Sequence, residues 1–513
     1  MVCGAVLLCN CVMGVTLIYL DSLPPLHQTL RMLDFRPAGY VIGMLVVALG
    51  AAMLLPMIVD IVTQSGHAGA FAVSAFITCI SGAVIALACA NAAEGGLTIQ
   101  QTFFLTTGVW LVLPFFGSLP FIFGATEARF VDAFFEAMSG LTTTGGTVFT
   151  GLDTMPKGLL FWRGLMQWFG GIGVVVMAMV FLPMLRVGGM QIFRTEGFDT
   201  FGKILPRAAE IARNISSIYI TLTLTCMVAY AMAGQSFFDA MVHAMTTIAT
   251  GGFANYDASF INLGAATEYI AATFMILAAL PFVRYVQFMG GSVTPLFKDS
   301  QIRAFAMTLL VVVVMLTLWR FTFVTQSGEF AFRKALFNGV SILTGTGYAS
   351  DDYMLWGGFP ITIFFLIGLI GGCAGSTTCS IKIFRFQLLF ASIRAQIQRI
   401  HNPSGIFQPR YERRPVSEDV ISSVMAFFML FMVSLAVLSI ALGMTGLDAV
   451  TSISGAAAAL ANIGPGLGAE IGPSGNFAGL NDGAKWLLSA GMLVGRLELM
   501  AVYVMFTATF WKG

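Results

Sequence analysis

Charged residues are scarce in this sequence. Asp, Glu, Lys and Arg make up 10% of its 513 residues, whereas 57% are apolar; a soluble domain carries about 25% charged residues. So few charges cannot cover a water-facing surface, and the composition therefore predicts an integral membrane protein in contact with membrane lipid. The net charge of +1 leaves no polybasic field, so no nucleic-acid partner is expected.

Metal-binding and redox patterns are also missing. The eight cysteines form no Cys-x-x-Cys pair and the four histidines are scattered, so neither a disulfide framework nor a zinc site is expected. Gly464-Pro-Gly-Leu-Gly468 is superficially similar to a dinucleotide-binding loop, but no βαβ pattern surrounds it and no Walker lysine follows. Since no nucleophile–base pair is evident either, the sequence predicts a protein that is not an enzyme and has no organic cofactor.

Long apolar runs predict ten membrane-spanning helices, because about 20 apolar residues are needed to cross a bilayer. The ten runs are 39–62, 70–91, 99–123, 159–185, 213–234, 266–290, 303–325, 360–385, 418–443 and 484–510. Residues 1–20 are apolar as well. They are either an eleventh helix or a stretch that precedes an alternative start at Met32.

Basic residues indicate how these helices are oriented. They lie between the fourth and fifth, the sixth and seventh, and the eighth and ninth predicted spans. The positive-inside rule places these connectors in the cytoplasm. The alternate connectors then open to the outside, where Asp153, Asp257, Asp351 and Asp352 could attract cations.

Four further apolar stretches are too short to cross a bilayer and suggest re-entrant segments. They cover 131–143, 238–249, 334–345 and 448–462. Each leads into a turn rich in Gly and Thr or in polar residues. One glycine recurs in each turn: Gly145, Gly251, Gly347 and Gly464.

This recurring unit of span, short segment, turn and span predicts the fold class. We expect an all-α integral membrane protein in which four pseudo-symmetric helix–pore loop–helix repeats surround a central pore, preceded by at least two extra N-terminal helices. The expected division is an N-terminal segment 1–38, two extra helices in 39–95, and pore repeats in 96–190, 205–296, 300–395 and 415–513.

Four such turns around one axis suit a potassium pore. A potassium ion must exchange its hydration shell for protein oxygens, and rings of backbone carbonyls supply them. Glycine lets the backbone leave helical geometry and lets four chains approach closely. For a single turn, close helix packing through small residues is an equally simple explanation, but four aligned turns favour the pore.

Several long motifs are similar to those of a known family. They are Asp132-Ala-Phe-Phe-Glu-Ala-Met-Ser-Gly-Leu-Thr-Thr-Thr-Gly145, Gln167-Trp-Phe-Gly-Gly-Ile-Gly173, His243-Ala-Met-Thr-Thr-Ile-Ala-Thr-Gly-Gly-Phe253, Gly371-Gly-Cys-Ala-Gly-Ser-Thr377, Asn462-Ile-Gly-Pro-Gly-Leu-Gly468 and Gly495-Arg-Leu-Glu498. Through these motifs residues 39–513 resemble the Trk/Ktr/HKT superfamily of potassium transporters, and most closely its TrkH branch.

The resemblance implies that K⁺ is the transported ion and assigns a selectivity filter to the four turns. Its strands would be Thr143, Thr144 and Gly145; Ala249, Thr250 and Gly251; Gly345, Thr346 and Gly347; and Asn462, Ile463 and Gly464. In the related plant transporters a serine at the first filter glycine goes with sodium preference. The glycine at position 145 therefore implies selectivity for potassium.

The resemblance also implies an intramembrane gating loop, 371–380, that interrupts the eighth span. The gating residues would be Gly371, Gly372, Gly375, Ser376, Thr377, Lys382, Arg496 and Glu498. Arg496 would line the pore below the filter, although a mutual salt bridge of Arg496 with Glu498 is the simpler alternative. Where the family usually has further glycines, Thr378, Cys379 and Ser380 stand here, which points to a stiffer loop or to different gating.

The resemblance further implies a bacterial inner-membrane protein that forms a homodimer. A separate cytoplasmic nucleotide-binding subunit of the TrkA type would dock on the basic connectors. One alternative mechanism stays open, namely potassium symport coupled to protons or sodium. Glu136, His243 and Glu498 are the candidate coupling groups for that mechanism.

Overall fold

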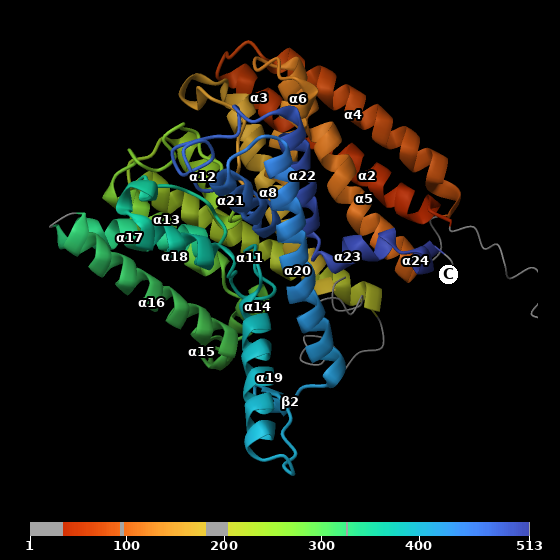
Figure 1. The fold of residues 1–513 in the computed structure, drawn as a ribbon. Coiled ribbons are helices and arrows are strands. Elements are labelled where there is room, and N and C mark those ends of the chain that lie inside the picture. Colours follow the sequence, from red (N-terminus) through yellow and green to blue (C-terminus); the bar gives the residue numbers. More distant parts are fainter. Residues whose placement is uncertain (1–33, 93–96, 181–203, 325–326, 512–513) are drawn as a thin grey trace, which may run out of the picture.

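The computed structural model describes residues 34–92, 97–180, 204–324 and 327–511. These residues form a helical body from which one long helix and a small hairpin project (Figure 1). The expectations for residues 1–20 and for a start at Met32 lie outside the described residues.

The elements follow the expected order along the chain. The N-terminal part and first predicted repeat contain α2 (Arg36–Ala52), α3 (Leu54–Val62), α4 (Ala68–Cys89), the 3-10 helix η2 (Ala90–Ala92), α5 (Ile99–Gly117), α6 (Leu119–Phe123), α7 (Phe130–Leu141), the 3-10 helix η3 (Leu152–Thr154) and α8 (Lys157–Val180). The second predicted repeat contains α11 (Ile204–Met232), α12 (Phe237–Ile248), α13 (Ala265–Ala278) and α14 (Phe282–Met289).

The remaining elements belong to the third and fourth predicted repeats. The third region contains α15 (Thr294–Lys298), α16 (Ser300–Phe323), α17 (Gly328–Leu343), the 3-10 helix η5 (Tyr353–Trp356), α18 (Gly358–Gly368) and α19 (Ile383–His401). An antiparallel hairpin of β1 (Arg410–Tyr411) and β2 (Arg414–Pro415) follows. The fourth region contains α20 (Glu418–Met444), α21 (Ala449–Ala461), α22 (Asp482–Arg496), α23 (Met500–Tyr503), the 3-10 helix η6 (Val504–Phe506) and α24 (Ala508–Trp511).

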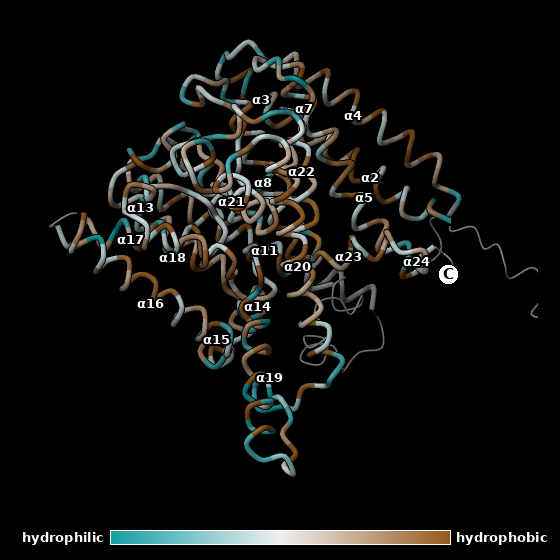
Figure 2. Tube along the Cα trace, viewed as in Figure 1, coloured by the Kyte–Doolittle hydropathy of each residue, from teal (hydrophilic) through white to brown (hydrophobic). Residues whose placement is uncertain are grey.

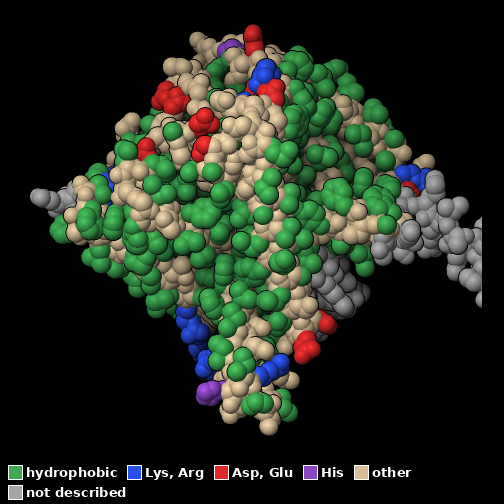
Figure 3. All heavy atoms as spheres, viewed as in Figure 1, with side chains coloured by type: hydrophobic (Ala, Val, Ile, Leu, Met, Phe, Trp, Pro, Cys, Tyr) green, Lys and Arg blue, Asp and Glu red, His purple; other side chains and the backbone are tan. Residues whose placement is uncertain are grey.

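Seven helices within the described ranges are long and apolar enough to cross a membrane, counting α2 with α3 and α5 with α6 as single spans. They confirm seven of the ten predicted runs. The long helices are hydrophobic through most of their length (Figure 2). On the face shown in Figure 3, hydrophobic side chains cover a broad middle band and charged side chains lie mainly above and below it. The chain is a multi-pass membrane protein.

Two of the other three predicted spans are wrong as single helices. The run 266–290 is divided into α13 and α14, which meet at 87°. Pro281 lies at the break, where it lacks an N–H to continue the helix. Carbonyl oxygens at the end of α13 accept from another segment instead: Ala279 O accepts the N–H of Cys373, and Ala278 O accepts the hydroxyl of Thr377, both at 3.2 Å.

The last predicted span, 484–510, is also bent. α22 ends at Arg496, and the following helices leave it at 103°. Glu498 and Leu499 have φ values of 60° and 31°, which a continuous α-helix does not contain. The side chain of Glu498 forms an ion pair with Arg385 of α19, which fixes the bend against a distant helix.

The eighth predicted span is interrupted, as expected. α18 ends at Gly368 and α19 begins at Ile383, and the residues between them are not helical. α19 continues to His401, well beyond the predicted end at residue 385, and forms the projection at the bottom of Figure 1. Arg394 and Arg399 on this projection are exposed to solvent.

The four short helices α7, α12, α17 and α21 confirm the predicted short segments; α17 begins earlier than predicted, at Gly328. Their packing follows one rule. Each lies between the two long helices of its own region and also contacts the second helix of the preceding region: α7 contacts α22, α12 contacts α8, α17 contacts α13, and α21 contacts α18. These contacts close a circle of four units in chain order.

Candidate functional site

Each short helix ends in a turn of the same backbone shape. The residue that leaves the helix has a left-handed conformation, with φ values of 53° at Thr143, 48° at Thr250, 75° at Gly345 and 50° at Asn462. Such values are uncommon for residues other than glycine, and β-branched threonine adopts them at a cost. The surrounding structure therefore has to hold these turns in place.

The four turns meet in a closed ring. A Cβ atom built on Gly145 would lie 2.1 Å from Gly251 O, and one on Gly252 would lie 1.9 Å from Thr346 O. The ring continues because a Cβ on Gly347 would lie 2.8 Å from Gly464 N. It closes because a Cβ on Gly464 would lie 3.0 Å from Gly145 C. A Cβ would clash at Gly145, Gly252 and Gly347 and would be a tight contact at Gly464, so the four backbones approach one another directly.

The second turn differs by one residue from the predicted alignment. The N–H of Gly251 bonds to the carbonyl five residues earlier, as does the N–H of Thr144. Gly252 has a φ of 81°, close to the 89° of Gly145. Gly252 is therefore the structural counterpart of Gly145, and the predicted equivalence of Gly251 with Gly145 is wrong.

The sequence contains the signal for this register. The thirteenth residues after Asp132, Asp239 and Lys334 are Gly145, Gly252 and Gly347. The predicted alignment instead follows the Thr-Gly pair that three of the turns share. The local pair is the weaker guide, because the position of a turn relative to its helix decides which backbone atoms meet.

On one side the ring opens into a cavity of about 130 Å³. The ring glycines Gly145, Gly252, Gly347 and Gly464 contribute to its lining, together with the segments that follow the turns. Tyr256 also lines it. Burial raises the pKa of Tyr256 to about 12, helped by the hydrogen bond that its hydroxyl donates to Asp239.

The acidic residues expected to attract cations have different partners. Asp257 lines the cavity, but its carboxylate accepts the N–H groups of Gly151 and Leu152 at 2.8 and 3.1 Å. Asp351 pairs with Arg320 at 2.5 Å. The carboxylate of Asp153 accepts the backbone N–H of Asp257, and the carboxylate of Asp352 accepts that of Met354. These contacts hold the loops, and only Asp257 faces the cavity.

The non-helical segment between α18 and α19 folds back on itself. Gly371 N donates to Ile381 O at 2.8 Å, and a Cβ on Gly371 would lie 2.0 Å from Cys379 O. The hydroxyl of Ser376 donates to Cys373 O at 2.6 Å. The glycine at position 371 is therefore required for two strands of this loop to lie side by side.

At Cys379 this segment contacts the ring on the side opposite the 130 Å³ cavity, which we call the underside of the ring. The Sγ of Cys379 lies 3.6 Å from Thr143 Oγ1, and its Cβ would lie 3.1 Å from a Cβ on Gly345. Arg496 donates to the same sulfur at 2.9 Å and approaches Gly170 O at 3.5 Å. The structure thus brings the predicted gating segment, Arg496 and two of the turns together.

The other predicted gating residues lie slightly further along. Lys382 precedes α19 and donates through Nζ to the carbonyl and hydroxyl oxygens of Thr378. Glu498 pairs with Arg385, so the expected alternative of a mutual Arg496–Glu498 bridge is not what the structure shows. Arg385 also stacks on Phe427, 3.9 Å from its ring centre. Nothing in its local sequence identifies Arg385 as the partner.

Long apolar helices around a ring of polar backbone define a membrane protein whose centre can present oxygen atoms to a cation. A family model described as a cation transport protein, TrkH, matches residues 67–512. The chain belongs to the TrkH family of cation transport proteins.

Individual relatives are similar over nearly their full length. The chain is 43% identical over 493 residues to the Trk system potassium uptake protein TrkI of Halomonas elongata, covering 94% of this chain and 98% of that protein. It is 36% identical over 488 residues to TrkH of Salmonella typhimurium, covering 94% and 100%. The crystal structure of the potassium transporter TrkH from Vibrio parahaemolyticus superposes with a TM-score of 0.86 at 32% identity, covering 93% and 100%.

Proposed function

We propose that this protein takes up potassium across the bacterial inner membrane through a gated pore, as the membrane subunit of a Trk system. Membership of a cation transport family supports a transporter rather than an enzyme. The names of the similar proteins support potassium as the cargo. The observation that carries the proposal is the closed ring of four turns, because such a ring can aim backbone carbonyls at a dehydrated cation.

In this proposal the four turns are the selectivity filter of four pseudo-symmetric repeats. The filter strands are Thr143–Gly145, Thr250–Gly252, Gly345–Gly347 and Asn462–Gly464. The short helices support this role, since each points its C-terminal end, with its partial negative charge, toward its turn. Glycine at position 145 agrees with potassium selectivity.

We assign gating to the segment 371–380 together with Lys382, Arg496 and Glu498. The contact of Cys379 with Thr143 and Arg496 supports this assignment, because it places a side chain and a guanidinium against the underside of the ring. A positive charge there opposes the passage of a cation. Movement of the segment would have to remove both groups from the path.

Ion-coupled symport is less well supported. The carboxylate of Glu136 is fully buried and paired with Arg163 at 2.8 Å. The His243 ring is bonded through both nitrogens, to Gln235 and to the backbone of Asn255. Glu498 is paired with Arg385. Each candidate coupling group already has a structural partner in the described part of the chain.

The projecting end of the molecule, formed by α19 and the hairpin, is a suitable surface for a regulatory partner. We propose that a cytoplasmic nucleotide-binding subunit of the TrkA type docks on α19 and the hairpin, and that two copies of the chain form the working unit. Exposed basic side chains support an electrostatic contact there: Arg394, Arg399, Arg410, Arg413 and Arg414.

The test is potassium uptake in cells that lack their own potassium transporters, with the cognate regulatory subunit present. The wild type should restore growth at low potassium, and Gly145→Ser should lose potassium selectivity and admit more sodium. The reason is steric, because a Cβ at position 145 meets Gly251 O at 2.1 Å and the φ is +89°.

Gly151→Ser is the matched control. Gly151 also has a positive φ, +72°, but the nearest atom to its Cβ would be Thr154 Oγ1 at 3.8 Å. A wild type that reaches the membrane and restores no uptake would contradict the proposed function. If Gly145→Ser and Gly151→Ser behaved alike, the function would stand and the filter would have to lie elsewhere.

A further inference from the structure

Behind the ring, a side chain of each short helix accepts one backbone N–H of the chain that leaves its turn. The acceptor is a different residue in each region. Glu136 Oε2 accepts the N–H of Val148 at 3.0 Å, His243 Nε2 that of Asn255 at 3.3 Å, Asn338 Oδ1 that of Ser350 at 3.2 Å, and Ser454 Oγ that of Leu467 at 2.8 Å. We call these four residues the brace residues.

The four bonds occupy one equivalent place. Val148, Asn255, Ser350 and Leu467 are each the third residue after a ring glycine, provided that Gly252 is the ring glycine of the second turn. The brace residues of the first three regions are each the fourth residue after the position that begins the short segment, namely Asp132, Asp239 and Lys334. Four chemically unlike side chains therefore perform one geometric task.

Glu136 is the most heavily bonded brace residue. Its carboxylate also accepts the hydroxyl of Thr147 at 3.0 Å and the guanidinium of Arg163 at 2.8 Å. Arg163 in turn donates to Ala254 O at 3.0 Å, next to the backbone that His243 holds. The first and second braces are thus joined through one buried arginine.

The His243 brace fixes which ring nitrogen carries the proton. Nε2 accepts the N–H of Asn255, so the proton lies on Nδ1, which donates to Gln235 Oε1 at 2.9 Å. The ring packs against Tyr230, Tyr256 and Phe260. The charged group nearest to it is Asp239, one turn earlier on the same helix, whose carboxylate bonds Asn255 and Tyr256.

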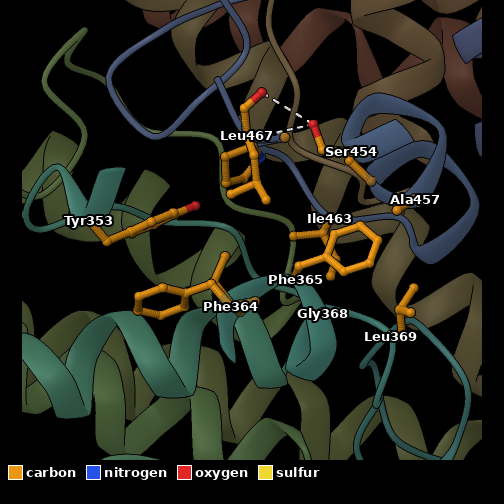
Figure 4. A pocket seen from close by; sticks show the side chains of 13 residues that line it. Tyr353, Phe364, Phe365, Gly368, Leu369, Ser454, Ala457, Ile463 and Leu467 are labelled. Carbon is orange, nitrogen blue, oxygen red and sulfur yellow. Dashed lines mark hydrogen bonds between the residues drawn. The ribbon is translucent and has the colours of Figure 1, made fainter. Parts of the chain in front are cut away.

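The third and fourth braces are neutral. Asn338 accepts from Ser350 N and returns a bond from Nδ2 to Ser350 Oγ at 3.1 Å. Ser454 accepts from Leu467 N and approaches Leu467 O at 3.2 Å, which Figure 4 shows as dashed lines beside a small cavity. This cavity of about 40 Å³ is lined by Ser454, Leu467 and apolar side chains of α18.

We propose that Glu136, His243, Asn338 and Ser454 are positioning residues that set the selectivity of the ring for K⁺ over Na⁺. The inference rests on the proposed function. Each brace ties the outgoing strand of a turn to the helix that enters it, so the ring carbonyls lie between two fixed points. Loss of one acceptor loosens one strand, most of all in the fourth region, and the ring can then contract around a smaller ion.

Ser454→Ala is the sharpest test because it removes one acceptor and almost no volume. Full-length protein with its regulatory subunit is expressed in cells that lack potassium transporters, and initial uptake of Na⁺ and K⁺ is measured together with the amount of protein in the membrane. The Na⁺/K⁺ uptake ratio should rise by roughly two- to tenfold, the range that one hydrogen bond corresponds to.

Two variants of the same helix sharpen the comparison. Ser452→Ala is the matched control, since Ser452 is equally buried on α21 but donates to Leu447 O within its own helix entrance. Its ratio should equal that of the wild type. Ser454→Thr keeps the hydroxyl, and the adjacent cavity leaves room for the added methyl group, so it should restore the wild-type ratio.

The outcomes separate the two proposals. A wild type without potassium uptake contradicts the proposed function. A wild type that takes up potassium, with Ser454→Ala matching Ser452→Ala in its ratio, overturns the brace proposal alone. If Ser454→Ala does not accumulate, Asn338→Ala is compared with Asn338→Asp, which keeps the oxygen that accepts the N–H of Ser350. Equal ratios in that pair also overturn the brace proposal.

Discussion

The four turns share a backbone shape but not a means of support. In the first and third turns, hydroxyl groups of the turn bond within the turn. Thr142 Oγ1 and Thr144 Oγ1 lie 2.8 Å apart, as do the corresponding atoms of Thr344 and Thr346. In each of these turns a serine of the short helix also donates to the carbonyl that follows the ring glycine, at 2.6 and 2.8 Å.

The second and fourth turns depend on other parts of the chain. Gln167 of α8 donates to Gly251 O at 2.5 Å and accepts from Phe253 N at 3.0 Å. Asn462 of the fourth turn donates to Thr144 Oγ1 at 3.0 Å and to Met492 O of α22 at 2.9 Å. The first and third turns are therefore alike in side chains, whereas the second and fourth differ from them and from each other and share only their dependence on contacts outside the turn.

This difference shows that similar backbone turns can be supported by different side-chain contacts. A turn that has hydroxyl groups at the right places supports itself. The second turn borrows a donor from α8 of the preceding region, and the fourth turn donates to Thr144 of the first turn, so both contacts couple the repeats. Substitutions in the borrowed contacts should therefore disturb the ring more than substitutions in the self-supported turns.

Gln167→Leu should have the largest effect. It removes both bonds that hold the second turn and leaves the buried Gly251 carbonyl without its donor, which costs about 1–3 kcal/mol. We expect potassium uptake to fall about tenfold or more at equal protein abundance. Gln101→Leu is the control, because Gln101 is also buried and makes two main-chain hydrogen bonds, but to Thr98 and Asp34, which precede α5 and α2. Equal losses in both variants would contradict the special role of the second turn.

Asn462→Gly should have an intermediate effect. Glycine keeps the left-handed φ of 50° without strain and deletes both side-chain bonds. The Na⁺/K⁺ uptake ratio should rise by about two- to tenfold, as expected when hydrogen bonds worth about 0.5–1.5 kcal/mol each no longer support the ring. A ratio indistinguishable from that of the wild type would mean that the fourth turn supports itself as well.

Thr142→Val and Thr344→Val should have the smallest effects, and equal ones. Each replaces a hydroxyl by a methyl group of similar size and breaks one hydroxyl pair. Each variant should lower the stability of the detergent-solubilised protein by about 0.5–1.5 kcal/mol and change the uptake ratio less than Asn462→Gly does. Thermal unfolding and ion uptake measured on both variants check this. Clearly unequal effects would break the pairing of the first and third turns.

Local patterns in the sequence were sufficient for much of this architecture. The short apolar segments, the glycine turns and the interruption before Ile383 are visible because each depends on composition within a few residues. The bends at Pro281 and Arg496 were missed, since the apolar runs continue through them. Their backbone groups are satisfied by distant partners that a hydropathy pattern does not contain.

The sequence by itself determined the class of protein, the positions of most spanning helices, the four short helices and the glycines of three of the four turns. Only the tertiary structure decided that Gly252 and not Gly251 belongs to the ring, that Glu498 pairs with Arg385, and that four unlike side chains brace the turns. The physical reason is the range of the contacts. Hydrophobic length and glycine freedom act within one segment, whereas hydrogen-bond partners across the ring are chosen by how the segments pack.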